Sequence, residues 1–310
     1  MSDRIHDDEI DTSEATVRSL LADQLPSWAD APMSPLQSSG TTNALWRLRG
    51  DGDLVVRLPR MPSGARSIDT EVALLPRLAE AGLIEGVAVP ELVHAGAPSA
   101  AYPLPWMAVR WLDGDDLWEQ RDATVAASAG LVDDLAAVVH TISALADMSA
   151  PARSPGSRGG PLGPLLDRLD TWLSDPAWSA DRLIDVAAVR RCATPARELA
   201  DEEVPTAFTH GDLIPGNLLI ADGRLSAVID WGGAGHGDPA QDLAPAWAVF
   251  DEPQRRRFRD ACEADDATWL RARTIELEHA VGGFLYYGPR NHPLGDVMAR
   301  TLERIIAESI

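Results

Sequence analysis

Three polar side chains in the second half of the chain are spaced so that one could accept a proton and two could hold a metal ion. Asp212 lies on a predicted loop five residues before Asn217, and Asp230 ends a later strand. Asn217 leads into a predicted hairpin that Asp230 closes, so both are expected at the same end of it. An amide and a carboxylate oxygen suit Mg²⁺, which completes its shell with phosphate oxygens and water. Asp212 is not needed as a ligand and could take the proton of a hydroxyl group.

The hairpin that must position these two ligands is predicted by its turn. Two apolar runs of strand length, residues 218–220 and 225–229, flank a connection that contains Asp222-Gly223. Asp-Gly favours the backbone angles of a tight hairpin turn. The hairpin is an exception in a second half whose other patterns are helical.

The order of these residues reproduces the arrangement of protein kinases, in which a catalytic-loop Asp is followed by an Asn five residues on and by a later metal-binding Asp. In more detail, His210-Gly211-Asp212, Asn217 and Ile229-Asp230-Trp231 resemble the signature of the aminoglycoside phosphotransferase family. The resemblance continues through residues 237–244 and covers nearly the whole chain from Gly40 to the C-terminal helices.

The resemblance implies that Asp212 is the catalytic base and that Asn217 and Asp230 hold Mg²⁺, with ATP or GTP as co-substrate. It also implies an α+β, bilobal protein-kinase-like fold. The nucleotide-binding N-lobe, an antiparallel sheet with the hinge, is expected over residues 1–112. The mainly helical C-lobe, with the catalytic loop, the metal site and the acceptor site, is expected over residues 113–310.

Hydrophobic patterns along the chain agree with that fold, since period-two alternation is concentrated before residue 112 and helical spacing after it. In the first part we expect helices over residues 11–25, with Asp11 as N-cap, and 70–81, and strands over 44–49, 54–58, 91–95 and 106–112. In the second part we expect a helix over 124–147, an exposed Pro- and Gly-rich loop over 151–161, and helices again from residue 165.

A phosphate-binding loop is expected between the first helix and the first strand pair. By family analogy, residues 38–43 stand in place of a kinase glycine-rich loop. Backbone N–H groups around Ser39, Gly40 and Thr41, with a hydroxyl, would contact the β- and γ-phosphates. A plain turn is the alternative.

Arg57 stands where family members usually place a Lys that pairs with the α/β-phosphates. Arg keeps a permanent charge and binds phosphate oxygens through two donors, so it can replace Lys electrostatically. Its expected ion-pair partner is Glu71, in the following helix. An Arg here also resembles the macrolide-kinase-like branch of the family. A solvated Arg and a surface Glu are the alternative.

The strand and linker that join the two lobes are expected over residues 107–114. By the resemblance, the C=O of Arg110 and the N–H of Leu112 contact the purine base. Because backbone atoms make these contacts, the sequence leaves ATP and GTP open.

Several further residues are interpreted as structural. His210 is expected to orient its loop rather than move a proton, and Asp242 to brace that loop. Glycine-rich residues 233–237 lack the helix and the distant acidic residue of a dinucleotide site, so a flexible segment is expected. Candidate acceptor-site residues, for which a solvated acidic face is the alternative, are Asp113, Asp115, Asp116, Glu119, Glu276 and Glu278.

The charge of the chain restricts its partners. All 27 cationic residues are Arg, and 48 Asp and Glu give a net charge of −21. An acidic surface repels phosphate backbones and anionic lipids, so we expect neither nucleic acid nor a membrane as a partner. Most of the excess negative charge lies in residues 113–310, and this favours a cationic acceptor. Cys192 and Cys262 fit no metal or disulfide pattern, and the acidic N-terminus lacks a signal-peptide core, so a cytoplasmic monomer or homodimer is expected.

Together these features predict a small-molecule O-phosphotransferase that moves the γ-phosphate of ATP or GTP to a hydroxyl of an antibiotic, an aminoglycoside or a macrolide. A metabolite kinase of the choline, homoserine or fructosamine type is the alternative. A non-catalytic nucleotide-binding pseudokinase is disfavoured because Asp212, Asn217 and Asp230 are all present. A protein kinase is disfavoured because the segment between Asp230 and Asp238 is too short to dock a peptide.

Overall fold

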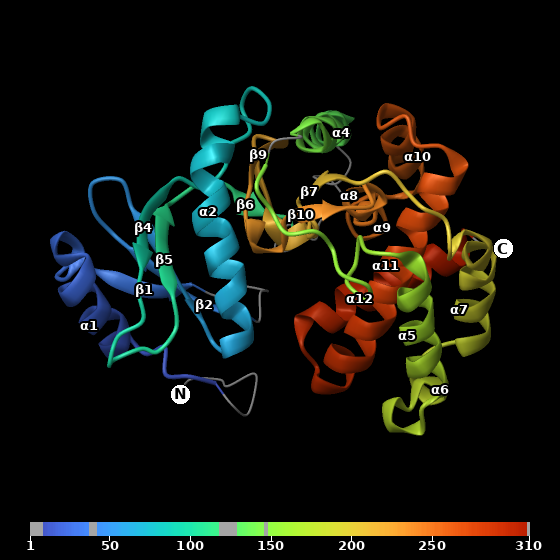
Figure 1. Ribbon diagram of the computed structural model, residues 1–310, viewed down its shortest axis with the longest axis horizontal. Helices are drawn as coiled ribbons and strands as arrows, with labels where there is room; N and C mark the ends of the chain where they lie inside the picture. The colour runs from blue at the N-terminus through green and yellow to red at the C-terminus, as the bar shows by residue number, and fades with distance from the viewer. Residues whose placement is uncertain (1–8, 37–41, 118–128, 146–147, 309–310) are drawn as a thin grey trace.

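The computed structural model describes residues 9–36, 42–117, 129–145 and 148–308. Figure 1 shows an antiparallel sheet with two helices on one side of the molecule and a mainly helical part on the other. Within the described residues the sheet has five strands in the order β1-β2-β3-β5-β4, and every neighbouring pair is antiparallel. The strands are β1 (Met33–Leu36), β2 (Asn43–Leu48), β3 (Leu54–Pro59), β4 (Leu92–Gly96) and β5 (Trp106–Arg110).

Alternate residues of the central strands pack against different helices. Val56 and Ala108 pack with α1 (Glu14–Gln24), whereas Met107 packs on the side of α2 (Ala65–Ala81). This is the period of two that strand side chains follow. The α1 face has a hydrophobic cluster of its own, while the α2 face shares one large cluster with the helical part. In Figure 1, α2 lies between the sheet and the rest of the molecule.

One long helix organises the helical part. This helix, α11 (Asp266–Tyr287), packs against α5, α8 and α12, and it is buried on most of its circumference. The other helices are α4 (Ala129–Ala144), α5 (Leu162–Ser174), α6 (Ala180–Leu183), α7 (Val186–Ala193), α8 (Ala240–Leu243), α9 (Ala246–Val249), α10 (Glu252–Ala261) and α12 (Pro293–Ala307). None of the helices in the described ranges combines the length and the apolar composition that a membrane crossing requires.

Short strands lie between the two parts and carry the residues singled out by their chemistry. The predicted hairpin is β8 (Leu218–Ala221) and β9 (Arg224–Val228), with β6 (Asp115–Asp116) beside β8. A second antiparallel pair is formed by β7 (Ala207–Thr209) and β10 (Gly235–Gly237). The sequence patterns predict only the hairpin, because strands of two or three residues are too short to show a period.

The α+β prediction is confirmed: an antiparallel sheet lies in the first part and most helices in the second. The N-cap prediction is wrong by two residues. Ser13 is the N-cap of α1, because Asp11 accepts hydrogen bonds from Ser13 N (3.1 Å) and Thr16 Oγ1 (2.5 Å) instead of capping the helix. The lobe boundary after Leu112 stays a prediction.

A buried carboxylate on α4 holds the β8–β9 hairpin. Asp134 is 6% exposed, and its Oδ2 accepts from Arg224 Nε at 2.7 Å and from Leu225 N at 3.2 Å. These donors hold the pKa of Asp134 below its usual value, although burial opposes them; the Arg224 bond is the largest influence. The hairpin that carries Asn217 and Asp230 at its end is therefore anchored to α4 at its other end.

Replacing Asp134 by Asn is expected to lower the free energy of unfolding by about 1–3 kcal/mol, because the charge-assisted bonds to the hairpin are lost in a buried place. The adjacent Asp133 pairs with Arg257 on the surface, so Asp133→Asn is a matched control with an expected change below about 0.5 kcal/mol. Urea unfolding of both variants measures this. Equal losses would contradict an anchoring role for Asp134.

Candidate active site

Arg57 joins three elements of the fold through one guanidinium group. From β3, its Nη1 donates to Glu71 Oε2 on α2 at 2.7 Å, and its Nη2 donates to Asp230 Oδ1, beyond β9, at 2.8 Å. Arg57 is 7% exposed and Glu71 is fully buried. The expected ion pair between Arg57 and Glu71 is present. The second pair, to Asp230, was outside any sequence pattern because 173 residues separate the two positions.

The turn that follows Asp230 is held against α2. Glu71 Oε1 accepts from Gly232 N at 3.0 Å, and a side chain at Gly232 would overlap Ser67 of α2. Asp230 has a φ of 62°, in the left-handed region that Asp adopts more readily than most residues. The sharp turn at the end of β9 thus brings the Asp230 carboxylate to Arg57 and the next backbone N–H groups to α2.

Asn217 and Asp230 lie at the same end of the hairpin, as its turn chemistry predicts. In the register of β8 and β9, Leu218 lies opposite Val228, and Ile229 N donates to Asn217 O at 3.0 Å. The last hydrogen bond of the hairpin is thus formed by Asn217 and by the residue before Asp230, which places both residues at the end where a common ligand could bind.

Asp212 is hydrogen-bonded to the Asn217 amide. Nδ2 of Asn217 donates to the backbone oxygen of Asp212 at 2.8 Å and to its Oδ2 at 3.1 Å. Because Nδ2 donates these two bonds, Oδ1 is the side-chain atom of Asn217 that is left to bind a metal ion. Burial raises the pKa of Asp212 above its ordinary value, against the opposing charge of Arg158. A raised pKa suits a carboxylate that must take up a proton.

His210 orients the loop that carries Asp212. Its Nδ1 accepts from Asp212 N at 3.2 Å, so Nε2 carries the proton and donates to Ile229 O at 3.1 Å. The ring is fully buried and packs edge-on against Trp231 at 4.5 Å. Burial lowers the pKa of His210 to about 4. The imidazole is thus neutral at pH 7 and joins the catalytic loop to the end of β9.

Asp242 on α8 braces the same loop from another side. Its two carboxylate oxygens accept from His210 N and Gly211 N, each at 2.7 Å. Burial raises the pKa of Asp242 to about 6, while these two donors and the charge of Arg153 act in the opposite direction. The bracing contact expected of Asp242 is therefore present.

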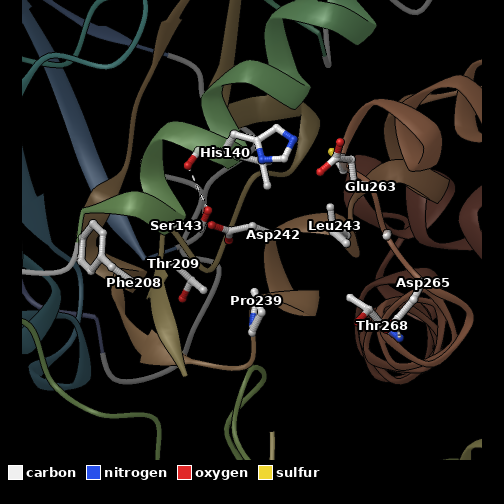
Figure 2. Close-up of a pocket in the computed structure, with 13 residues that line it drawn as sticks. His140, Ser143, Phe208, Thr209, Pro239, Asp242, Leu243, Glu263, Asp265 and Thr268 are labelled. Carbon is white, nitrogen blue, oxygen red and sulfur yellow. Dashed lines mark hydrogen bonds between the residues drawn. The ribbon is translucent and has the colours of Figure 1, made fainter. Parts of the chain in front are cut away.

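A cavity of about 190 Å³ lies on the α4 side of Asp242. Figure 2 shows Asp242 near the centre of its lining residues, with His140 above and Thr268 to the side. Asp212, Asn217 and Asp230 do not line it. The cavity is therefore separate from the group of residues that could do phosphate chemistry.

The donor set around Asp230 fits a divalent cation. Glu71 and Asp230 share the single guanidinium of Arg57, and Asp230 is the carboxylate of the two that keeps its charge at neutral pH. Burial raises the pKa of Glu71 to about 8; Asp230 is also desolvated, but Arg57 holds its pKa below the ordinary value. In the described part of the chain no three His, Cys, Asp or Glu side chains form a metal site. An Asn and an Asp as the only protein ligands are what Mg²⁺ with phosphate oxygens requires.

The other nucleotide-binding candidates are only partly described. Ser39, Gly40 and Thr41 lie outside the described residues. Arg110 ends β5, where its N–H donates to Glu91 O at 2.9 Å and its guanidinium to Gly52 O at 2.8 Å. The C=O of Arg110 and the N–H of Leu112 as base contacts stay predictions.

Most of the candidate acceptor residues have partners inside the protein. Glu278 pairs with Arg168 at 2.7 Å, and Asp113 accepts from Trp111 Nε1 at 2.8 Å. Asp115 and Asp116 form β6, and Glu119 lies outside the described residues. Glu276 is buried, with Oε1 lacking a hydrogen-bond partner. Among these residues Glu278 is engaged by a cation of the protein, whereas Asp113 and Asp115 are exposed.

The loop over residues 151–161 is irregular, as predicted, but only partly exposed. Arg153 N donates to His236 O at 2.8 Å, and His236 N donates to Pro151 O at 2.9 Å, so the start of the loop runs beside β10. Further on, Gly159 is buried and its oxygen accepts from Asp238 N at 2.8 Å. Residues 233–237, expected to be flexible, supply the backbone for this pairing. The glycines at both places were the signal for such a close approach.

Comparisons with known proteins bear on the family and the fold of the chain. The model of the APH phosphotransferase enzyme family matches residues 35–276. Among solved structures, the chain is similar to the GDP and kanamycin complex of APH(2")-IIia, with 20% identity, coverage of 96% of this chain and 98% of that chain, and a TM-score of 0.72. No curated protein matches the chain at a significant level.

Two further solved structures show the same fold. The chain is similar to the apoenzyme of macrolide 2'-phosphotransferase MphH from Brachybacterium faecium, with 23% identity, coverage of 92% and 97%, and a TM-score of 0.62. It is also similar to a thermostable mutant of aminoglycoside phosphotransferase APH(4)-Ia in a ternary complex with AMP-PNP and hygromycin B, with 19% identity, coverage of 94% and 98%, and a TM-score of 0.62. The predicted bilobal kinase-like fold is thereby confirmed.

The buried, neutral state of His210 predicts a pH dependence of stability. Because burial lowers its pKa to about 4 and an unfolded His titrates near pH 6.5, the unfolded chain binds more protons between these values, and stability is lost as the pH falls. Between pH 7 and pH 5, the linkage to His210 lowers the free energy of unfolding by about 2 kcal/mol.

Replacing His210 by Asn removes the titrating ring and keeps a hydrogen-bond acceptor on the side chain. The unfolding free energy of this variant is expected to fall less than that of the wild type between pH 7 and pH 5, by about the same 2 kcal/mol. Urea unfolding at the two pH values measures it. An identical fall in both proteins would show that His210 is not held neutral by the fold.

Proposed function

The chain belongs to the APH phosphotransferase enzyme family, and we propose that it transfers the γ-phosphate of ATP or GTP to a hydroxyl group of an antibiotic, an aminoglycoside or a macrolide. The observation that carries the proposal is the grouping of Asp212, Asn217 and Asp230 at the end of the β8–β9 hairpin. Similar structures were solved with GDP and kanamycin and with AMP-PNP and hygromycin B, which supports the choice of donor and acceptor. A cytoplasmic monomer or homodimer is part of the proposal.

The proposed reaction uses Asp212 as the base. The Asn217 amide holds the Asp212 carboxylate by a hydrogen bond, and the raised pKa of Asp212 favours uptake of the proton that the acceptor hydroxyl loses. Asn217 Oδ1 and the Asp230 carboxylate would hold Mg²⁺, which when bound neutralises charge on the transferred phosphoryl group. Phosphoryl transfer depends mainly on positioning and charge, so these residues orient the reactants rather than bond to them.

Arg57 is proposed to orient Asp230. Both of its Nη atoms are engaged by carboxylates, one from Glu71 and one from Asp230. Each Nη nitrogen carries a second N–H group, and Nε has no hydrogen-bond partner among the described residues, so Arg57 can also donate to the α/β-phosphates, as the resemblance implies. Nucleotide contacts by Ser39, Gly40 and Thr41 and by the backbone of Arg110 and Leu112 complete the proposal.

A second candidate is a metabolite kinase of the choline, homoserine or fructosamine type. One observation favours it: Glu278, a candidate partner of a polycationic acceptor, is buried and paired with Arg168 inside the protein. A neutral or singly charged acceptor is therefore compatible with this side of the molecule. Among antibiotics, the same observation favours a macrolide over an aminoglycoside with many amino groups.

The purified protein should add one phosphate to an acceptor when incubated with Mg²⁺ and either ATP or GTP. The panel is kanamycin, hygromycin B, erythromycin, choline and homoserine, with mass spectrometry as the readout. Phosphate on one of the antibiotics is the expected result, and EDTA should abolish it. Phosphate only on choline or homoserine would favour the metabolite kinase. Tight nucleotide binding without transfer to any acceptor would contradict both.

Replacing Asp212 by Asn should lower kcat by about 10²–10⁴-fold, because the amide cannot take up the proton. Nucleotide affinity should stay within about threefold of the wild type, since the contacts of Asn217 and Asp230 are retained. Asp222→Asn, in the exposed hairpin turn, is the matched control and should leave both values unchanged. Fluorescence titration with a nucleotide analogue and steady-state kinetics measure the two quantities. Full activity of the Asp212 variant would rule out its role as base.

A further inference from the structure

Arg153 places a guanidinium group beneath the catalytic loop, where neither sequence nor family pattern assigns a residue. Its Nη2 donates to Thr209 Oγ1 at 3.2 Å, and that hydroxyl donates to Gly235 O at 2.9 Å. Thr209 is fully buried and directly precedes His210. Arg153 is thus linked to the last residue of β7, from which the loop with Asp212 begins.

Three glycines make room for this side chain, and we call Gly211, Gly235 and Gly237 the glycine cradle. A Cβ atom at Gly211 would overlap the Arg153 guanidinium, and one at Gly237 would overlap its Cγ. A Cβ atom at Gly235 would lie 3.4 Å from its Nε. Gly211 also has a φ of 84°, which side chains rarely adopt. Gly211 and the glycine-rich residues 233–237 therefore pack around one partly buried arginine side chain.

The charge of Arg153 acts on Asp242, the carboxylate that braces the loop, and favours its ionised form. Asp242 holds His210 N and Gly211 N at 2.7 Å each, which requires both of its oxygens as acceptors. A buried carboxylate keeps its charge only if a cation or donors compensate for the lost hydration. The field of Arg153 acts on Asp242 in this sense. An apolar side chain would fill the cradle equally well but would not supply this charge.

We propose that Arg153 is a positioning residue for the catalytic base: it holds the loop over residues 209–212 through its bond to Thr209 and its packing against Gly211. The inference rests on the proposed function in so far as Asp212 is the base. Arg153 does not touch the reacting atoms in this account. Its effect on the rate comes from the placement of Asp212, for which an error of about 1 Å costs roughly 10²-fold in rate.

The test compares Arg153→Met and Arg153→Lys with Arg257→Met, an exposed arginine that pairs with Asp133. Hydrogen exchange is followed in peptides covering residues 207–213 and, as an internal reference, α11. In Arg153→Met, exchange over 207–213 should rise at least about tenfold while α11 stays unchanged, because a local restraint is lost. Arg153→Lys, which keeps the charge, should restore part of the protection, and Arg257→Met should match the wild type.

Kinetics give the second readout, with the best acceptor of the panel above. In Arg153→Met, kcat should fall about 10- to 100-fold with the nucleotide KM within about threefold, and Arg153→Lys should recover part of the rate. A parallel rise of KM, or no recovery by Lys, would show a general packing role and overturn the proposal. Unchanged exchange over 207–213, or an equal rise there and in α11, would overturn it as well.

The outcomes separate this inference from the proposed function. If the wild type transfers phosphate to no acceptor, the proposed function fails, and hydrogen exchange alone decides whether Arg153 holds the loop. If Arg153→Met does not fold, Thr209→Val, which removes the acceptor of Nη2 but keeps the arginine, takes its place with the same readouts. Wild-type exchange and rate in that variant would overturn the proposal.

Discussion

One guanidinium with two carboxylates holds the candidate site together. Arg57 on the sheet pairs with Glu71 on α2 and with Asp230 at the end of the hairpin, and all three come from different elements. Removing one partner of a buried ion pair leaves an uncompensated charge and costs about 3–5 kcal/mol. Neither the sheet nor the hairpin can therefore shift without the other, and the place of Asp230 beside Asn217 depends on a residue of the opposite part of the molecule.

Other arginine side chains in the structure also donate hydrogen bonds to two groups at once. Arg255 donates from Nε to Glu308 and from Nη1 to the oxygen of Phe250, both at 2.8 Å, and Arg224 joins the hairpin to Asp134. The planar fork of Arg suits such double contacts, whereas an ammonium group is a single point of charge. A chain whose cationic residues are all Arg thus keeps many of its acids neutralised internally.

Features that depend on neighbouring residues could be predicted from the sequence, whereas contacts between distant residues could not. The placing of Asn217 and Asp230 at one end of the hairpin follows from one Asp-Gly turn, and the Arg57–Glu71 pair was implied by the family resemblance. The Arg57–Asp230 pair joins positions 173 residues apart, and nothing in either segment signals the other. Arg153 was hidden for another reason: its loop is irregular, and only the packing of glycines around its side chain shows that it is partly buried. The strands β6, β7 and β10 are too short for any period.

The hydrophobic cluster on the α2 face has a consequence for how the chain is made. Buried residues of α2 and β5 share that cluster with residues as late as Ile305 in α12. On the ribosome, the sheet emerges first, and its α1 face can close at once with its own cluster. The α2 face packs on the turn over residues 231–233 and stays uncovered until that turn has been synthesised. A nascent chain of this protein therefore carries an apolar surface through much of translation, and a chaperone that shields such surfaces would act on this face first.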